Sequence, residues 1–196
     1  MEITMKQLIR WVLLPLVLLM SQFGAQAERA DVLEYAKYFA THWVSSLNTP
    51  ASQDDINRIV EVAFDQGVKH RIDPLLLLSM IKKESTFNKN AKNKRSPASG
   101  LMQVIPYWHR DKIKGRNIFK VSVNIEVGAK VLRGCLDRNS QNVPAALRCY
   151  SGGGHNNYVS TVVRDHKQAQ RWVVENQFKN QLPVYYARAT ATDLVF

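Results

Sequence analysis

Apolar residues recur at helical spacing along most of the chain, and strand-like alternation is scarce. Positions three and four residues apart lie on one face of an α-helix, so each such stripe predicts a helix with a buried side. Ser52, a residue type favoured at helix N-caps, precedes one such stripe. That stripe consists of Ile56, Ile59, Val60, Ala63 and Phe64. The pattern as a whole predicts an all-α, predominantly helical fold.

A second stripe ends on a carboxylic acid. Asp73 is suited to cap this helix, and Pro74 to occupy its first position, where the missing N–H costs nothing. The stripe consists of Leu77, Met80, Ile81 and Glu84. Glu84 therefore ends an apolar helix face, where partial loss of hydration and the helix dipole both favour its protonated form.

The polar stretch 86–99 is predicted to be a loop that ends at Gly100. Residues 102–105 are predicted to form a short helix that Pro106 stops. Ser122 is expected to cap the next helix. Its buried face consists of Ile125, Gly128, Leu132 and Cys135. A glycine inside such a face indicates a close neighbour, because glycine otherwise weakens a helix.

Two further helices complete the prediction. Pro144 opens a short helix over 145–150, and Tyr158 begins a long one that reaches about Phe178. The tail after it, residues 179–196, is expected to dock as an extended arm around Pro183.

The N-terminus has the pattern of a secretory signal peptide over residues 1–27. Lys6 and Arg10 precede a ten-residue apolar run, and Ala25-Gln26-Ala27 provides a small-x-small cleavage site. The run is shorter than the roughly 20 residues that span a bilayer, so no stable membrane anchor is expected after cleavage. The predicted organisation is a signal peptide (1–27), an N-terminal helix (28–50), the main domain (51–178) and the tail (179–196). We expect a periplasmic or secreted protein.

The formal net charge is +11, and much of it is concentrated after Glu84. Between Ser85 and Lys120, Asp111 is the single acid beside nine basic residues. These are Lys89, Lys92, Lys94, Arg95, Arg110, Lys112, Lys114, Arg116 and Lys120. Either they form an ordinary solvated surface or they face an anionic partner such as a wall polymer. Nucleic acid is not expected as a partner, because no binding motif accompanies the charge.

The two cysteines, Cys135 and Cys149, leave two interpretations open. In an exported protein an even count permits a disulfide. Alternatively they are small buried residues packed between helices.

Glu84 is the clearest candidate for chemistry. Cleavage of a glycosidic bond needs an acid that protonates the leaving oxygen, and a carboxylic acid in apolar surroundings suits that task. The alternative is an exposed acid at a helix end, as most glutamates are.

Four motifs together resemble the lysozyme-like lytic transglycosylases of the soluble (SLT) type. They are Glu84-Ser85, Gly100-Leu101-Met102-Gln103, Asn124-Ile125-x-x-Gly128, and Ala146-Leu147-Arg148-Cys149-Tyr150-Ser151-Gly152-Gly153. They occur in the family's order and at similar spacing, and the resemblance covers about residues 54–163. It implies a lysozyme-like single domain that cleaves the MurNAc–GlcNAc bond of peptidoglycan and leaves a 1,6-anhydromuramoyl end.

The resemblance also implies roles by position. Glu84 would be the sole catalytic acid and base, and Ser85 would orient the glycan or the reacting group. Met102 would form an apolar wall and Gln103 would hydrogen-bond a sugar near the cut. Tyr150 would lie close to Glu84 and help to fix the intermediate. No cofactor is implied.

The last motif departs from the family at two positions. Cys149 and Ser151 stand on either side of Tyr150, where the family has Ala-Tyr-Asn. As a substrate-binding residue, Ser151 would replace only part of the hydrogen bonding of an asparagine amide.

Three other functions remain as alternatives. A lysozyme-like hydrolase would keep Glu84 but needs a positioned water, usually with a second acid. A peptidoglycan-binding module without turnover would keep the groove alone. A wall metallopeptidase is disfavoured, because the five histidines show no metal-ligand spacing. The sequence does not choose between wall turnover and wall opening for a secretion, conjugation or pilus machine.

Overall fold

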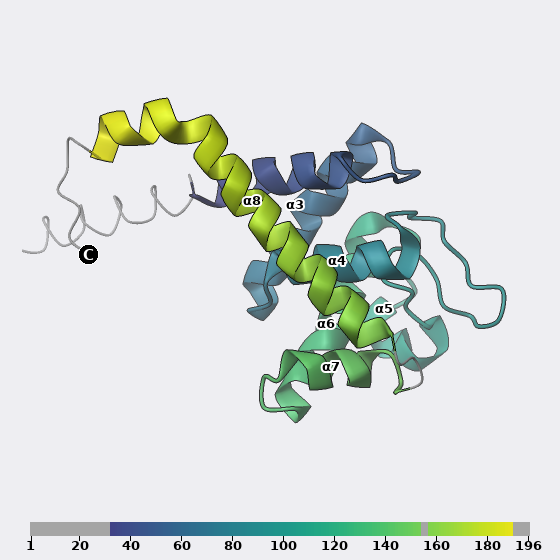
Figure 1. Cartoon of the computed structure of the whole chain (residues 1–196). Coiled ribbons are helices and arrows are strands. Elements are labelled where there is room, and N and C mark those ends of the chain that lie inside the picture. The colour runs from purple at the N-terminus through teal and green to yellow at the C-terminus, as the bar shows by residue number, and fades with distance from the viewer. Residues whose placement is uncertain (1–31, 154–156, 190–196) are drawn as a thin grey trace, which may run out of the picture. The chain divides into compact units, whose positions relative to one another are not determined.

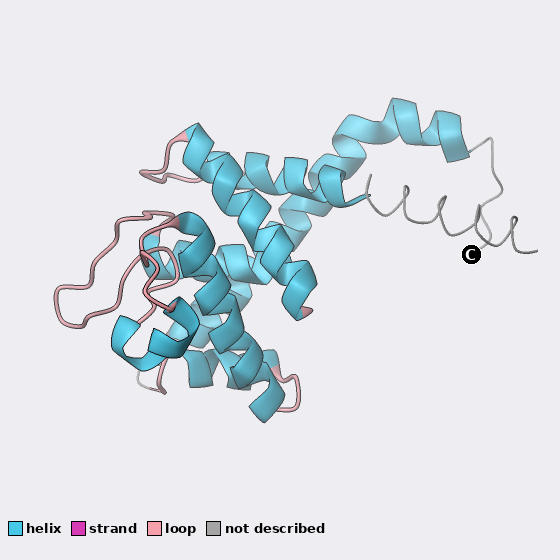
Figure 2. Ribbon diagram, turned by 180° about the vertical axis from the view of Figure 1, so that it is seen from behind, coloured by secondary structure: helices cyan, strands magenta, loops and turns pink. Residues whose placement is uncertain are grey.

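A computed structural model of the chain describes residues 32–153 and 157–189. Its named elements are helices, and the segments between them are loops (Figures 1 and 2), which confirms the predicted all-α fold. The predicted signal peptide over 1–27 lies outside the described residues. Within the described ranges, no helix is both long enough and apolar enough to cross a membrane.

The chain divides into two compact units, Met1–Tyr38 and Phe39–Phe196, and the second holds all the labelled helices. Residues 32–45 form a helix, within the predicted range 28–50. Phe39 and Trp43 on this helix are buried.

Helices α3 (Gln53–His70) and α4 (Pro74–Ser85) begin where the cap residues predict. The Ser52 side chain accepts a hydrogen bond from the backbone N–H of Asp55, and Asp73 accepts one from that of Leu75. Every residue of the apolar stripe predicted for α3 is buried. Such capping contacts lie within three residues of the cap, which is why the sequence alone reveals them.

The segment after Gly100 differs from the prediction. Residues 102–105 form no helix, because Gln103 takes a left-handed backbone conformation (φ 48°) and Val104 pairs with Ser99. Pro106 begins a helical segment instead of ending one. It opens η2 (Pro106–His109), which leads into α5 (Arg110–Ile113).

Helix α6 (Val121–Arg138) begins one residue before the predicted cap. Its N-cap is Lys120, which makes no side-chain capping bond, so the prediction for Ser122 is wrong. Helix α7 (Val143–Tyr150) is capped by Asn142, whose side chain accepts from the backbone N–H of Ala145.

Helix α8 (Tyr158–Ala189) begins at the predicted residue and is longer than expected. It packs against α4 and α7, and Figure 1 shows it crossing over α4. Pro183 and its neighbours belong to this helix, so an extended arm there is wrong. Residues 190–196 of the predicted tail lie outside the described residues.

Candidate active site

Glu84 lies in the last turn of α4, where its side chain is partly buried. The chain leaves the helix through two residues in left-handed conformations, Thr86 (φ 51°) and Phe87 (φ 63°). Non-glycine residues adopt this conformation rarely, so neighbouring contacts must hold the turn. Phe87 is buried, and the Thr49 hydroxyl donates a 2.8 Å hydrogen bond to the carbonyl of Thr86. The turn next to Glu84 is therefore fixed by the core and by the segment before α3.

Burial raises the pKa of the Glu84 carboxyl from 4.5 to about 7. The hydroxyl of Tyr158 and the ammonium of Lys83 favour the carboxylate and oppose that rise. No carboxylate of the described residues is among the groups that shift this pKa. Near neutral pH, Glu84 is thus a carboxylic acid that is able both to donate and to accept a proton.

Tyr150, the last residue of α7, lies beside Glu84. Burial, together with the charge of Glu84, raises the pKa of the Tyr150 hydroxyl. That hydroxyl donates a 2.8 Å hydrogen bond to the backbone carbonyl of Met102. The second and fourth motifs, whose bonded residues are 48 apart in sequence, therefore meet at this bond.

The loop that carries Gln103 is fastened to α6 by Asn124. The Asn124 side chain is buried, accepts a 2.7 Å hydrogen bond from the N–H of Met102, and donates to the carbonyls of Ser99 and Ile118, each at 2.9 Å. Gly100, with φ 76°, lies so close to Asn124 that a side chain there would overlap its amide. The asparagine of the third motif thus has a clear structural role, which the sequence alone did not reveal.

Met102 does not form the apolar wall of the site that the family resemblance implies. Its side chain is 0% exposed and packs against Gly128, where a Cβ atom would overlap Met102 Sδ. The prediction that Gly128 admits a close neighbour is confirmed. Met102 reaches the site through its backbone carbonyl, because its side chain lies in the core.

The other predicted site residues hydrogen-bond the backbone near them. Ser85 Oγ donates to the carbonyl of Ile81, and Ser151 Oγ to that of Arg148. The Gln103 amide donates to the carbonyls of Gly100 at 3.0 Å and Ala91 at 3.3 Å. In this structure Gln103 thus holds together the two sides of the loop between α4 and η2.

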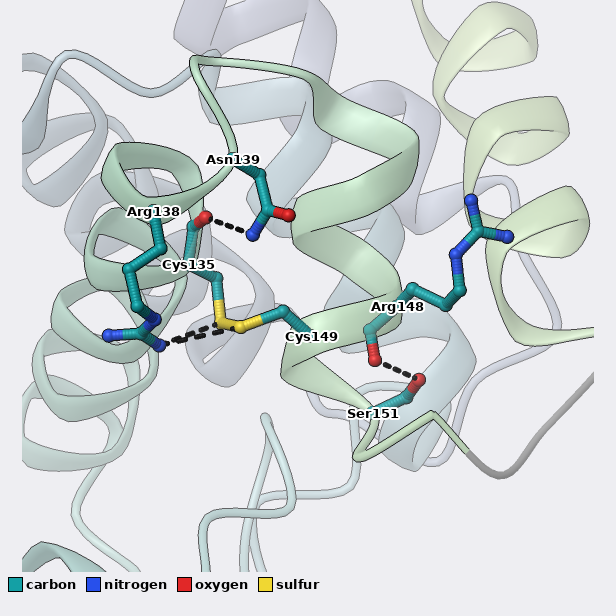
Figure 3. The surroundings of a disulfide bond; sticks show 6 residues. All are labelled: Cys135, Arg138, Asn139, Arg148, Cys149 and Ser151. Carbon is teal, nitrogen blue, oxygen red and sulfur yellow. Dashed lines mark hydrogen bonds between the residues drawn. A yellow bond between two sulfur atoms is a disulfide. The ribbon is translucent and has the colours of Figure 1, made fainter.

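Cys135 and Cys149 form a disulfide that joins α6 to α7 (Figure 3). Their Cα atoms are 5.8 Å apart. The guanidinium of Arg138 lies 3.4 Å from both sulfur atoms. Tyr150 directly follows Cys149 in sequence, so the disulfide anchors α7 to α6 next to Tyr150.

Tyr158 also belongs to the site, although the sequence did not single it out. Its hydroxyl is buried close to Glu84, but makes no well-aligned hydrogen bond with any described residue. The signal in the sequence was a hydroxyl at the start of an apolar face that continues with Val162. That signal alone does not show that Tyr158 lies near Glu84, because their proximity depends on the packing of α8 against α4.

Three of the nine basic residues between Ser85 and Lys120 form ion pairs. These pairs are Lys89 with Asp55, Lys112 with Asp111, and Arg116 with Glu126. Lys94, Arg95, Lys114 and Lys120 are exposed, with no ion pair to any described residue. Tyr107 and Trp108 on η2 are 66% and 68% exposed. The described part of the chain contains no cluster of His, Cys, Asp and Glu that could hold a metal ion.

These features define a helical protein with a partly buried carboxylic acid at the end of a core helix, next to two tyrosines. The family model of the transglycosylase SLT domain matches residues 61–173, more than half of the chain. The chain therefore belongs to this family of lysozyme-like lytic transglycosylases, as the four motifs predicted. No solved structure matches the chain.

Proposed function

We propose that this protein is a peptidoglycan lytic transglycosylase, which cleaves the MurNAc–GlcNAc bond and leaves a 1,6-anhydromuramoyl end. The observation that carries the proposal is the environment of Glu84. Burial holds its pKa at about 7, and none of the groups that shift this pKa is a carboxylate. Membership of the SLT family supports the same substrate class.

A single carboxyl group suffices for this reaction. The Glu84 carboxylic acid donates its proton to the glycosidic oxygen, and the bond between that oxygen and C1 of the muramoyl sugar breaks. The Glu84 carboxylate then accepts the proton of the same sugar's 6-hydroxyl, as the 6-oxygen bonds to C1. Atoms and charge balance without water, and Glu84 regains its proton.

The neighbouring residues have supporting roles in this proposal. Tyr150 stands beside Glu84 and links it to the loop of Gln103 through the bond to Met102. The amide nitrogen of Gln103 binds the loop, and its side-chain carbonyl oxygen makes no hydrogen bond with any described residue, so that oxygen could accept one from a sugar. Ser85 and Ser151 would reach a glycan by giving up hydrogen bonds to the nearby backbone.

Wall peptidoglycan also suits the surface of the molecule. The exposed cations Lys94, Arg95, Lys114 and Lys120 fit an anionic polymer, and Tyr107 and Trp108 are exposed aromatics of the kind that stack on sugar rings. The signal-peptide pattern over 1–27 supports export to the periplasm or beyond. There the enzyme would serve wall turnover, or open the wall for a secretion, conjugation or pilus machine.

The direct test is digestion of purified peptidoglycan by the protein and by Glu84→Gln, with soluble products weighed by mass spectrometry. We expect products lighter than hydrolytic ones by one water molecule, and none from the variant. Reducing-end products would identify a lysozyme-like hydrolase instead. Retained wall binding with no products from either protein would identify a binding module.

A further inference from the structure

Tyr158 carries a buried hydroxyl that makes no well-aligned hydrogen bond with any described residue, although it lies close enough to Glu84 to shift the pKa of that carboxyl. The residue is 5% exposed, and Val162, one helical turn further along α8, is completely buried. Burying a hydroxyl without a partner costs free energy, and a phenylalanine would avoid that cost. Such a group therefore suggests a partner that is present only during the reaction.

Polar contacts at two levels fix how α8 lies along α4. Near the C-terminal end of α4, Lys82 pairs with Asp165 at 3.2 Å. At its N-cap, Asp73 Oδ2 is 2.7 Å from His166 Nε2 and 3.1 Å from Gln170 Nε2. Later residues of α8 thus meet earlier residues of α4, and the two helices run in opposite directions.

This register brings the start of α8 to the end of α4. Tyr158, Val162 and Asp165 are spaced at i, i+4 and i+7, so they lie on one face of α8. Since Asp165 meets Lys82, the face continues from there toward Tyr158 beyond Lys82, where Glu84 lies. The arrangement places the Tyr158 hydroxyl beside the Glu84 carboxyl.

We propose that the Tyr158 hydroxyl donates a hydrogen bond to the Glu84 carboxylate that forms when Glu84 has protonated the leaving oxygen. Tyr158 is then a positioning residue for the catalytic acid, and the inference rests on the proposed function. While Glu84 is protonated, the hydroxyl has no well-aligned acceptor among the described residues. When the carboxylate forms, a small rotation provides a charge-assisted hydrogen bond, which is stronger than one between neutral groups.

Three groups from three helices act electrostatically with Glu84. They are Lys83 on α4, Tyr150 on α7 and Tyr158 on α8. Lys83 is exposed, and the Tyr150 hydroxyl already donates a hydrogen bond to the Met102 carbonyl. Of the two tyrosines, Tyr158 is thus the one whose hydroxyl has no well-aligned acceptor among the described residues.

The test is Tyr158→Phe, compared with Tyr150→Phe as the matched control. Loss of the Tyr158 hydroxyl should leave the melting temperature unchanged or higher, because no well-aligned hydrogen bond is lost. It should lower kcat about tenfold, the value of one hydrogen bond to a charged group. The alkaline limb of the pH–rate profile should move to higher pH, because the carboxylate loses a donor. Tyr150→Phe should lower the melting temperature, since it loses a bond that is already made.

A readout independent of turnover is the titration of the Glu84 carboxyl carbon by NMR, where Tyr158→Phe should raise the pKa. An unchanged titration and pH profile in Tyr158→Phe would overturn the inference. A clear fall in melting temperature would also overturn it, because it would show a purely structural hydroxyl. If the titration shifts as expected but Glu84→Gln still cleaves peptidoglycan, the proposed function fails while the contact stands.

Discussion

Asn124 accepts a hydrogen bond from the backbone N–H of Met102, 2.7 Å away, and so ties α6 to the loop beside the candidate acid. The same amide donates to the carbonyls of Ser99 and Ile118. One buried side chain thus satisfies three backbone groups from two segments. Because Met102 in turn accepts from Tyr150, α6, the loop and α7 are joined at one place.

Asn124→Ala should therefore lower both stability and activity. The N–H of Met102 and the carbonyl of Ile118 would lose this partner, while the carbonyl of Ser99 would keep the N–H of Val104. We expect a loss of about 2–4 kcal/mol in the free energy of unfolding. Urea denaturation measures this loss. The control is Asn139→Ala, which removes one side-chain hydrogen bond, to the carbonyl of Cys135, and should cost about 1 kcal/mol. Equal losses in the two variants would contradict the role given to Asn124.

The contact between Gly128 and Met102 gives a second prediction. Gly128→Ala places a Cβ atom where the Met102 side chain lies, and should destabilise the fold by about 1–3 kcal/mol. Gly134→Ala on the same helix is the control. The atom nearest its added Cβ is Arg138 Nη1 at 3.4 Å, so higher helix propensity should stabilise it by up to about 1 kcal/mol.

A double-mutant cycle locates the source of the effect. If the overlap with Met102 causes the loss, Met102→Ala and Gly128→Ala combined should cost less than the sum of the two single changes. Additive costs would show that Gly128 matters for another reason.

Reduction of the disulfide should lower the melting temperature. The bond between Cys135 and Cys149 closes a short loop with a sequence separation of 14. By restricting the unfolded chain, such a bond stabilises the folded protein by about 3 kcal/mol. Melting curves with and without reductant measure the effect. The doubly substituted Cys135→Ser, Cys149→Ser protein should have a lower melting temperature than the oxidised wild type, and reductant should not change it. Equal curves for the oxidised and reduced wild type would contradict the prediction.

The raised pKa of Glu84 predicts how stability depends on pH. Between pH 4.5 and about 7 the folded protein retains a proton that an unfolded glutamate has released. The stabilisation from this proton is fully present below pH 4.5 and is lost as the pH rises through about 7. Glu84→Gln stays neutral throughout, so its stability relative to wild type should rise over this range and then level off.

Glu126 provides a control of opposite sign. Its hydrogen bonds and ion pairs with Arg116 and Lys130 hold its pKa at about 2. Glu126→Gln should therefore be less stable than wild type at neutral pH, and the difference should shrink as the pH falls toward 2. A Glu84→Gln difference that is flat across pH would contradict the burial of this carboxyl.

The sequence predicted those parts of the fold that depend on short-range chemistry. The caps Ser52 and Asp73 act within three residues, so the starts of α3 and α4 were readable. The start of α6 was not predictable. Ser122 is the better capping residue by type, but the actual N-cap is Lys120, which makes no side-chain capping bond. The helix predicted over residues 102–105 is absent because their conformation depends on the pairing of Val104 with Ser99 and on the hydrogen bond with Asn124, which no local pattern reveals.

The candidate site divides in the same way. Glu84 was predictable, because its helix face can be read from apolar spacing, and Gly128 indicated its close neighbour. The burial of Met102 beneath that glycine required the packing of two segments. Tyr158 was not predictable as a site residue, because its position beside Glu84 follows from how α8 packs along α4, and no local sequence pattern encodes that packing.

The most direct test of the central claim is peptidoglycan digestion in water labelled with heavy oxygen. If the sugar's own 6-hydroxyl attacks C1 while Glu84 serves as acid and base, the new muramoyl ends carry no label, and Glu84→Gln yields no ends at all. Heavy oxygen in those ends would show that water attacks C1, and would contradict the account.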